Sequence, residues 1–106
     1  MTEYELRIIP DCPNSDAAIH LFRQSLEAEG VPAAQLGVRV VRTEDEATKL
    51  GFHGSPSFVV DGQDLFPSET APAITCRVYR SAQGLAGLPA PESLRTAVRN
   101  ARTSLR

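Results

Sequence analysis

The side chains with the most distinctive chemistry in this 106-residue chain are two cysteines, Cys12 and Cys76. Cys12 begins the run Cys12-Pro13-Asn14-Ser15, which directly precedes a stretch with the apolar periodicity of a helix. Unpaired backbone N–H groups and the helix dipole stabilise an anion at such a position, so thiols there ionise more readily. We therefore expect Cys12 to be a reactive thiol, with the Ser15 hydroxyl donating a hydrogen bond to its sulfur.

Charged neighbours of this run act against that expectation. Asp11 and Asp16 place carboxylates close to Cys12, and nearby negative charge disfavours a thiolate. A cysteine without chemistry, buried or at the surface, therefore stays open as the alternative. His53, just ahead of a Ser-Pro pair, is a candidate to flank Cys12, and the alternative is an ordinary histidine of the connection. No spacing of His and Cys in the chain fits a structural zinc site, so no metal site is predicted.

Cys76 lies in a run rich in β-forming residues, where it alternates with Ile74 and Val78. This alternation predicts a strand over residues 73–80 with all three side chains on one apolar face. We therefore expect a buried, inert thiol. The alternative is a second sulfur within reach of Cys12, either as a resolving thiol or as a co-ligand of a metal.

The elements that must position these thiols follow from periodicity and from the placement of proline and glycine. Strands are predicted at 4–9, 37–42, 57–60 and 73–80, and helices at 13–29, 44–50 and from Pro91 onward. Asp61-Gly62 is a hairpin signal, which predicts that the last two strands pair antiparallel. The order β-α-β-α-β-β-α then gives one α/β domain over residues 1–106, with a four-stranded mixed sheet and helices on both faces.

Local signals mark the ends of the first two helices. Pro13 suits the first position of the first helix, and Gly30 is placed to end it. Thr43, with Glu46 three residues later, is a capping box for the second helix.

This order of elements resembles the thioredoxin-like superfamily. Cys12-Pro13-Asn14-Ser15 is similar to the glutaredoxin Cys-Pro-x-Cys motif, with serine in place of the second cysteine. Residues 55–62 are similar to the segment that carries the cis-proline, a strand and an Asp-Gly turn in that superfamily. The resemblance implies a cis peptide bond before Pro56, which would hold the preceding backbone beside Cys12, where an extended substrate would pair with it.

The function implied by the resemblance is thiol-disulfide exchange through a single cysteine. Cys12 and Ser15 would form the reacting centre, and the substrate would be bound by Pro13, Asn14, Ser55 and Pro56. A low-molecular-weight thiol is the expected co-substrate, with a mixed disulfide or a protein disulfide as the partner, and no other cofactor is expected.

Two other functions stay open. One is a non-catalytic thioredoxin-fold module that binds a partner through the groove around Pro56. The other is a two-thiol protein that binds a soft metal through Cys12 and Cys76. The second interpretation rests on a distant similarity to the core of organomercurial lyases, in which a carboxylate stands where this chain has Ser15.

The composition excludes several further classes. An apolar fraction of 42%, a charged fraction of 23% and a net charge of -2 describe an ordinary globular domain and argue against nonspecific nucleic-acid binding. The apolar runs are too short to cross a bilayer, and no secretory signal opens the chain, so we expect a cytoplasmic protein without membrane contact. Two cysteines are too few for a disulfide-stapled scaffold. The oligomeric state is not predicted.

Overall fold

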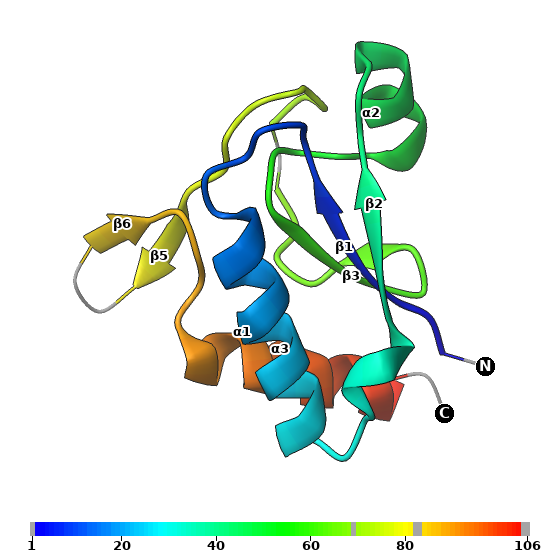
Figure 1. The fold of residues 1–106 in the computed structure, drawn as a ribbon, viewed down its shortest axis with the longest axis vertical. Coiled ribbons are helices and arrows are strands. Elements are labelled where there is room, and N and C mark those ends of the chain that lie inside the picture. The colour runs from blue at the N-terminus through cyan, green and yellow to red at the C-terminus, as the bar shows by residue number, and fades with distance from the viewer. Residues whose placement is uncertain (1, 69, 82–83, 105–106) are drawn as a thin grey trace.

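The computed structural model describes residues 2–68, 70–81 and 84–104, and Figure 1 shows their arrangement. The helices are α1 (Ser15–Ala28), the short 3₁₀ helix η1 (Ala33–Gln35), α2 (Glu44–Leu50) and α3 (Pro91–Ser104). The strands are β1 (Tyr4–Ile8), β2 (Leu36–Val40), β3 (Ser57–Val60), β4 (Gln63–Asp64), β5 (Tyr79–Ser81) and β6 (Gly84–Ala86). The predicted α/β class with a four-stranded mixed sheet is confirmed.

The main sheet has the strand order β2-β1-β3-β4. β1 runs parallel to β2, with Leu6 opposite Val38, and antiparallel to β3, with Leu6 opposite Phe58. The carboxyl ends of β1 and β2 therefore meet the amino end of β3 at one edge, which we call the upper edge because it is uppermost in Figure 1. Segments that precede or follow these strands are brought together there, although they lie far apart in the sequence.

Side chains alternate between the two faces of the sheet, and both faces carry a helix. α1 and α3 cross on the first face, where they bury Leu6, Phe22 and Phe58 completely. On the opposite face the guanidinium of Arg7 donates to the carbonyl of Leu50, the last residue of α2, at 3.2 Å. The predicted placement of helices on both faces is confirmed, because consecutive residues of β1 contact helices on opposite sides.

The N-terminus of α1 differs from the prediction by two residues. The chain leaves β1 through a reversal in which Asp11 adopts the left-handed conformation, with φ 59°. The helix begins only after this reversal, at Ser15, with Asn14 as its N-cap. Pro13 consequently precedes the helix and does not occupy its first position. The predicted end is confirmed, because Gly30 adopts a φ of 83° just beyond the helix.

The predicted Thr43 cap of α2 is confirmed, and Glu46 bonds back to the residue before Thr43 in place of the Thr43 N–H that a capping box uses. The Thr43 hydroxyl oxygen accepts from the Glu46 backbone N–H at 3.1 Å. The Glu46 carboxylate in return accepts from the Thr43 hydroxyl at 3.4 Å and from the Arg42 backbone N–H at 3.1 Å. Gly51 ends the helix in the left-handed conformation, as its sequence position indicates.

The predicted fourth strand at 73–80 is wrong, although the hairpin signal that pointed to it is correct. Asp61 and Gly62 both have positive φ, 50° and 81°, and close a two-residue turn. Such a turn returns the chain at once, so Gln63 pairs with Val60 and the antiparallel partner of β3 is β4. β4 is short, and Pro67 follows it without a backbone N–H for further pairing.

Residues 73–77, which we call the strap, run parallel to residues 52–55 at the upper edge. Ala73 N–H donates to the Phe52 carbonyl at 3.0 Å, and Ser55 N–H donates to the Thr75 carbonyl at 2.8 Å. Arg77 N–H then donates to the Ser55 carbonyl at 2.9 Å. Beyond the strap, β5 pairs with β6 in a hairpin that projects from the body of the protein (Figure 1).

Candidate thiol site

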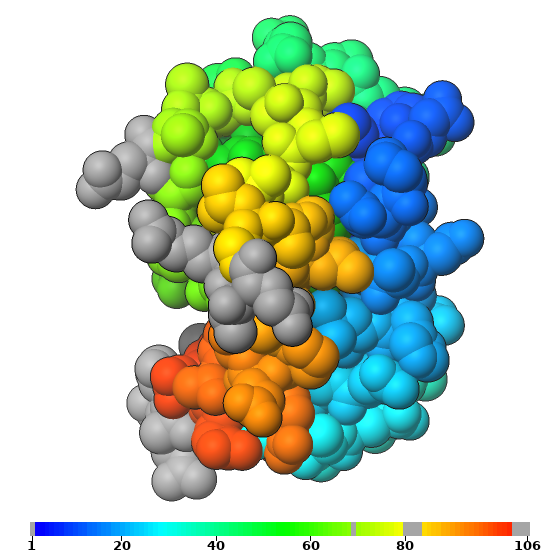
Figure 2. All heavy atoms as spheres, turned by 90° about the vertical axis from the view of Figure 1, so that its left-hand side faces the viewer, coloured from blue at the N-terminus to red at the C-terminus, as the bar shows by residue number. Residues whose placement is uncertain are grey.

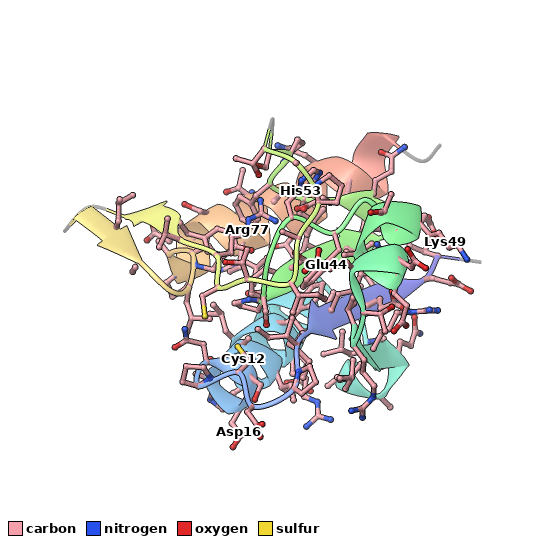
Figure 3. All side chains as sticks on the ribbon, turned by 90° about the horizontal axis from the view of Figure 1, so that it is seen from above. Cys12, Asp16, Glu44, Lys49, His53 and Arg77 are labelled. Atoms are coloured by element: carbon pink, nitrogen blue, oxygen red, sulfur yellow. The ribbon has the colours of Figure 1, made fainter. Side chains whose placement is uncertain are left out.

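Cys12 lies at the upper edge, in the loop that joins β1 to α1. The residue is buried, at 7% exposure, and Figure 3 shows its position beside the start of α1. The start of this loop is fastened to the segment before β3, because the Ile9 backbone N–H donates to the Ser55 hydroxyl oxygen at 3.1 Å. The fold therefore brings the Cys12 loop and the Ser55-Pro56 segment to the same edge, as the resemblance implies.

The Ser15 hydroxyl does not donate to the Cys12 sulfur, as the sequence had led us to expect, but to a backbone carbonyl. Its hydroxyl donates to the Cys12 backbone carbonyl at 3.0 Å, and its backbone N–H donates to the same oxygen at 3.2 Å. A serine three residues after a carbonyl reaches that carbonyl easily, so the local hydrogen bond takes precedence over one to the thiol. Ser15 therefore fixes the conformation of the loop at the start of α1.

Pro13 and Asn14, the predicted substrate-binding residues of this loop, differ in their surroundings. Pro13 is exposed, whereas Asn14 is partly buried against Gly87. A Cβ atom built on Gly87 would lie 2.3 Å from the Asn14 amide nitrogen Nδ2, so a larger residue there would require the Asn14 side chain to shift. The segment that follows β6 thus closes against the N-cap of α1.

Ser55 and Pro56 are both fully buried, and the peptide bond between them is cis, as predicted. The Pro56 carbonyl accepts a hydrogen bond from the Tyr79 hydroxyl. Both backbone groups of Ser55 are already paired, with the Thr75 carbonyl and with the Arg77 N–H of the strap. The backbone that the resemblance assigns to an extended substrate is therefore occupied by the chain itself.

Cys76 is exposed, which contradicts the predicted buried thiol. It lies in the strap directly opposite Ser55, with which it forms a parallel bridge. From Cys76 to Tyr79 the side chains alternate with the opposite face inward, because Val78 is 62% exposed, whereas Arg77 is largely covered and Tyr79 is buried. Ile74 keeps the predicted inward side and packs on the core. The structure thus brings Cys76 to the upper edge. The inward side chains of Arg77 and Tyr79 anchor this segment to the body of the protein.

Arg77 also lies at this edge, although the sequence did not indicate it as a residue of the site. Its side chain is only 9% exposed, and it forms an ion pair with Asp64 Oδ2 at 2.6 Å. The same guanidinium donates to the Ser57 hydroxyl oxygen at 3.3 Å and to the Phe66 carbonyl. It also lies 4.8 Å from the centre of the Tyr79 ring, within range of a cation–π contact. An arginine within a β-rich run is normally assigned to solvent, so the only sequence signal was Asp64 after the hairpin.

Tyr79 is held in an aromatic cluster below the strap. Its ring packs edge-to-face on Phe58 and Phe66, with centroid separations of 5.9 Å and 5.3 Å. Burial raises the pKa of Tyr79, and its protonated hydroxyl is the donor to the Pro56 carbonyl.

The remaining polar residues at this edge do not add to the thiol site. Figure 3 shows His53 well apart from Cys12, so the predicted flanking role has no support from the geometry. His53 Nδ1 is buried without a hydrogen-bond partner among the described residues. Asp16 lies on the Cys12 side and points outward (Figure 3), which keeps its charge in solvent.

Within the described parts of the chain, no three or more His, Cys, Asp or Glu side chains gather as a metal site. A groove between β4 and α3 is lined by other residues than those of the thiol site. No described helix has both the length and the apolar character that a membrane span requires. Comparisons with protein-family models, curated proteins and solved structures find no match to this chain.

Proposed function

We propose that this protein is a thioredoxin-like thiol-disulfide oxidoreductase with Cys12 as its reacting thiol. The observation that carries the proposal is the position of Cys12, between β1 and the start of α1. There its loop is hydrogen-bonded to the segment that contains Ser55 and Pro56. The order of elements and the mixed sheet support the resemblance on which the assignment rests.

The proposed reaction is an exchange between a small mixed disulfide and a small thiol. The Cys12 thiolate attacks one sulfur of R–S–S–R′, so that a Cys12–S–S–R bond forms and R′–S⁻ leaves and takes a proton from water. A thiol R–SH then loses its proton and attacks the R sulfur of this bond, which releases R–S–S–R and restores the Cys12 thiolate. In the net reaction R–S–S–R′ and one R–SH give R–S–S–R and R′–SH, so one disulfide replaces another, and no second protein cysteine takes part.

The residues around Cys12 have separate duties in this reaction. α1 begins three residues after Cys12, and we propose that the positive end of its dipole favours the attacking sulfur. Ser15 holds the Cys12 carbonyl and so keeps the loop against the helix. Asp16 acts in the opposite direction, although its outward position lets solvent weaken its repulsion of the thiolate.

The test is reduction of a small mixed disulfide by the purified protein with an excess of a small thiol. We expect turnover by the wild type, the uncatalysed rate with Cys12→Ser, and near wild-type turnover with Cys76→Ser, which is the matched cysteine control. Mass spectrometry of the Cys76→Ser protein should detect the mixed disulfide on Cys12. Equal rates for the wild type and Cys12→Ser would contradict the proposal and favour a non-catalytic module. Loss of turnover in Cys76→Ser would show that Cys76 resolves the intermediate.

A further inference from the structure

We infer that the strap closes this site to extended peptides and restricts its substrates to small disulfides. The inference rests on the proposed function and names the substrate class of the same site. It follows from three properties of the strap: the backbone groups that it occupies, the anchors that hold it, and the close approach that it makes to the segment before β3.

The strap occupies the backbone positions through which a peptide would bind. An extended chain that joins a sheet edge gains its affinity from main-chain hydrogen bonds to unpaired N–H and C=O groups. At Ser55 both groups are paired, with Thr75 at 2.8 Å and with Arg77 at 2.9 Å. A peptide would therefore have to displace the strap before it could form the same bonds, with no net gain in hydrogen bonding.

Anchors at both ends of the strap oppose such displacement. At the first end, the Ile74 N–H donates to the Glu44 carboxylate at 3.3 Å, and its side chain packs on the second core cluster of Val41, Ala47 and Phe52. At the other end, the Arg77 guanidinium is held by Asp64 and by two further acceptors. Opening the strap would separate a buried ion pair, which is costly unless both charges reach water.

Gly54 allows the strap to lie this close. Its φ is 120°, and a Cβ atom built on it would lie 3.0 Å from Arg77 Cβ and 3.3 Å from the Thr75 carbonyl oxygen. A side chain at this position would push the strap outward as well as strain the backbone. Figure 2 shows the strap covering the surface next to the loop that leads into α1.

A small disulfide needs none of the occupied groups. Its reaction requires access of one sulfur to Cys12 and space for a leaving thiol, without a main-chain partner on the protein. The exposed Cys76, opposite Ser55, marks the position that a side chain of a bound peptide would otherwise take. The strap therefore occupies the backbone groups with which an extended peptide would pair. A small disulfide does not need these groups, so their occupation does not affect its binding.

The experiment compares two mixed disulfides that share their glutathione half and differ in the thiol that leaves. One is bis(2-hydroxyethyl) disulfide after exchange with glutathione, and the other is an extended ten-residue peptide with one cysteine in a mixed disulfide with glutathione. For the wild type we expect a kcat/KM at least about tenfold higher for the small disulfide. Asp64→Asn and Arg77→Met, which release the strap, should raise the kcat/KM for the peptide by about tenfold and change that for the small disulfide little. Arg39→Met, at an exposed arginine of β2, is the matched control and should change neither.

A structural readout separates the strap from the chemistry. Amide hydrogen exchange should show strong protection of Ser55 and Arg77 in the wild type and in Arg39→Met, and loss of that protection in Asp64→Asn. Equal kcat/KM for both disulfides in the wild type would overturn the inference and leave the proposed function intact. So would an unchanged peptide rate once protection is lost. Inactivity on both disulfides would refute the proposed function and this inference with it. If the strap variants do not fold, the inference is decided by two wild-type measurements: the ratio of kcat/KM for the two disulfides and the amide protection of Ser55 and Arg77.

Discussion

Replacing Asp64 by asparagine tests the ion pair that holds the strap. The Asp64 and Arg77 side chains are 15% and 9% exposed, and their closest N and O atoms are 2.6 Å apart. The substitution keeps the shape of the side chain and removes its charge, so the guanidinium is left with the Ser57 hydroxyl and the Phe66 carbonyl. Removing one partner of a buried pair costs about 3–5 kcal/mol, because the other charge stays buried.

The two remaining acceptors reduce this cost. A hydrogen bond to a charged group is worth about 1.5–3 kcal/mol, and the introduced amide retains an oxygen that can accept one. We therefore expect Asp64→Asn to lower the free energy of unfolding by about 2–3 kcal/mol, against a total of about 5–15 kcal/mol for a small domain. In a domain of this size that loss lowers the Tm by roughly 10–20 °C.

Urea and thermal unfolding followed by circular dichroism measure the loss. Glu27→Gln, at an exposed carboxylate of α1, is the matched control and should change stability by less than about 0.5 kcal/mol. Arg77→Met and the double variant complete a cycle, in which we expect a coupling of about 1–3 kcal/mol between the two positions. A cost for Asp64→Asn no larger than that of Glu27→Gln, or additive effects in the cycle, would refute the reasoning.

Three further predictions follow from other contacts. Gly87→Ala should destabilise the fold by up to about 1 kcal/mol in thermal unfolding, because its Cβ would force the Asn14 side chain to shift. A thiol reagent added to the native protein should label Cys76 readily, in the wild type and in Cys12→Ser alike, since that thiol is exposed. Hydrogen bonds from Arg99, partly offset by desolvation, lower the pKa of Glu29 from 4.5 to about 2. Because this pKa is depressed in the folded state, its contribution to stability is complete above about pH 4.5 and is lost as the pH falls towards 2.

Each of these predictions has its own control and contrary result. Gly37→Ala introduces a Cβ only 3.7 Å from the nearest atom and should be tolerated, so equal losses at Gly37 and Gly87 would contradict the packing argument. Labelling of Cys76 should be absent from Cys76→Ser, and a Cys12→Ser protein that resists labelling until it is unfolded would contradict the exposure of Cys76. Glu29→Gln should reduce the loss of stability between pH 4.5 and 2, and an unchanged acid limb would show that Glu29 does not contribute to it.

Features that depend on residues close together in the sequence were predictable. The Thr43 cap and the left-handed Gly51 that ends α2 are formed by side chains and backbone within one or two helical turns. The Asp61-Gly62 turn likewise follows from the ease with which these two residue types adopt positive φ. Cys12 could be placed ahead of α1 for the same reason, because helix periodicity begins shortly after it.

The start of α1 and the role of Ser15 were less accessible to sequence reasoning. Both depend on how the chain reverses after β1, where Asp11 in the left-handed region delays the helix to Ser15. The Ser15 hydroxyl could donate either to the Cys12 sulfur or to the Cys12 carbonyl. The conformation of the loop brings it to the carbonyl.

The sequence by itself determined the alternation of residues 76–79, but the tertiary structure decided which side of it faces inward. Alternation divides a strand into two faces, and hydrophobicity assigns the more apolar one to the core, which favoured Cys76. The structure reverses this assignment because Asp64 and the Pro56 carbonyl, both distant in the sequence, satisfy Arg77 and Tyr79 when these are buried. Polar side chains can be buried when the interior contains hydrogen-bond or ion-pair partners for them, and only the fold determines where those partners lie.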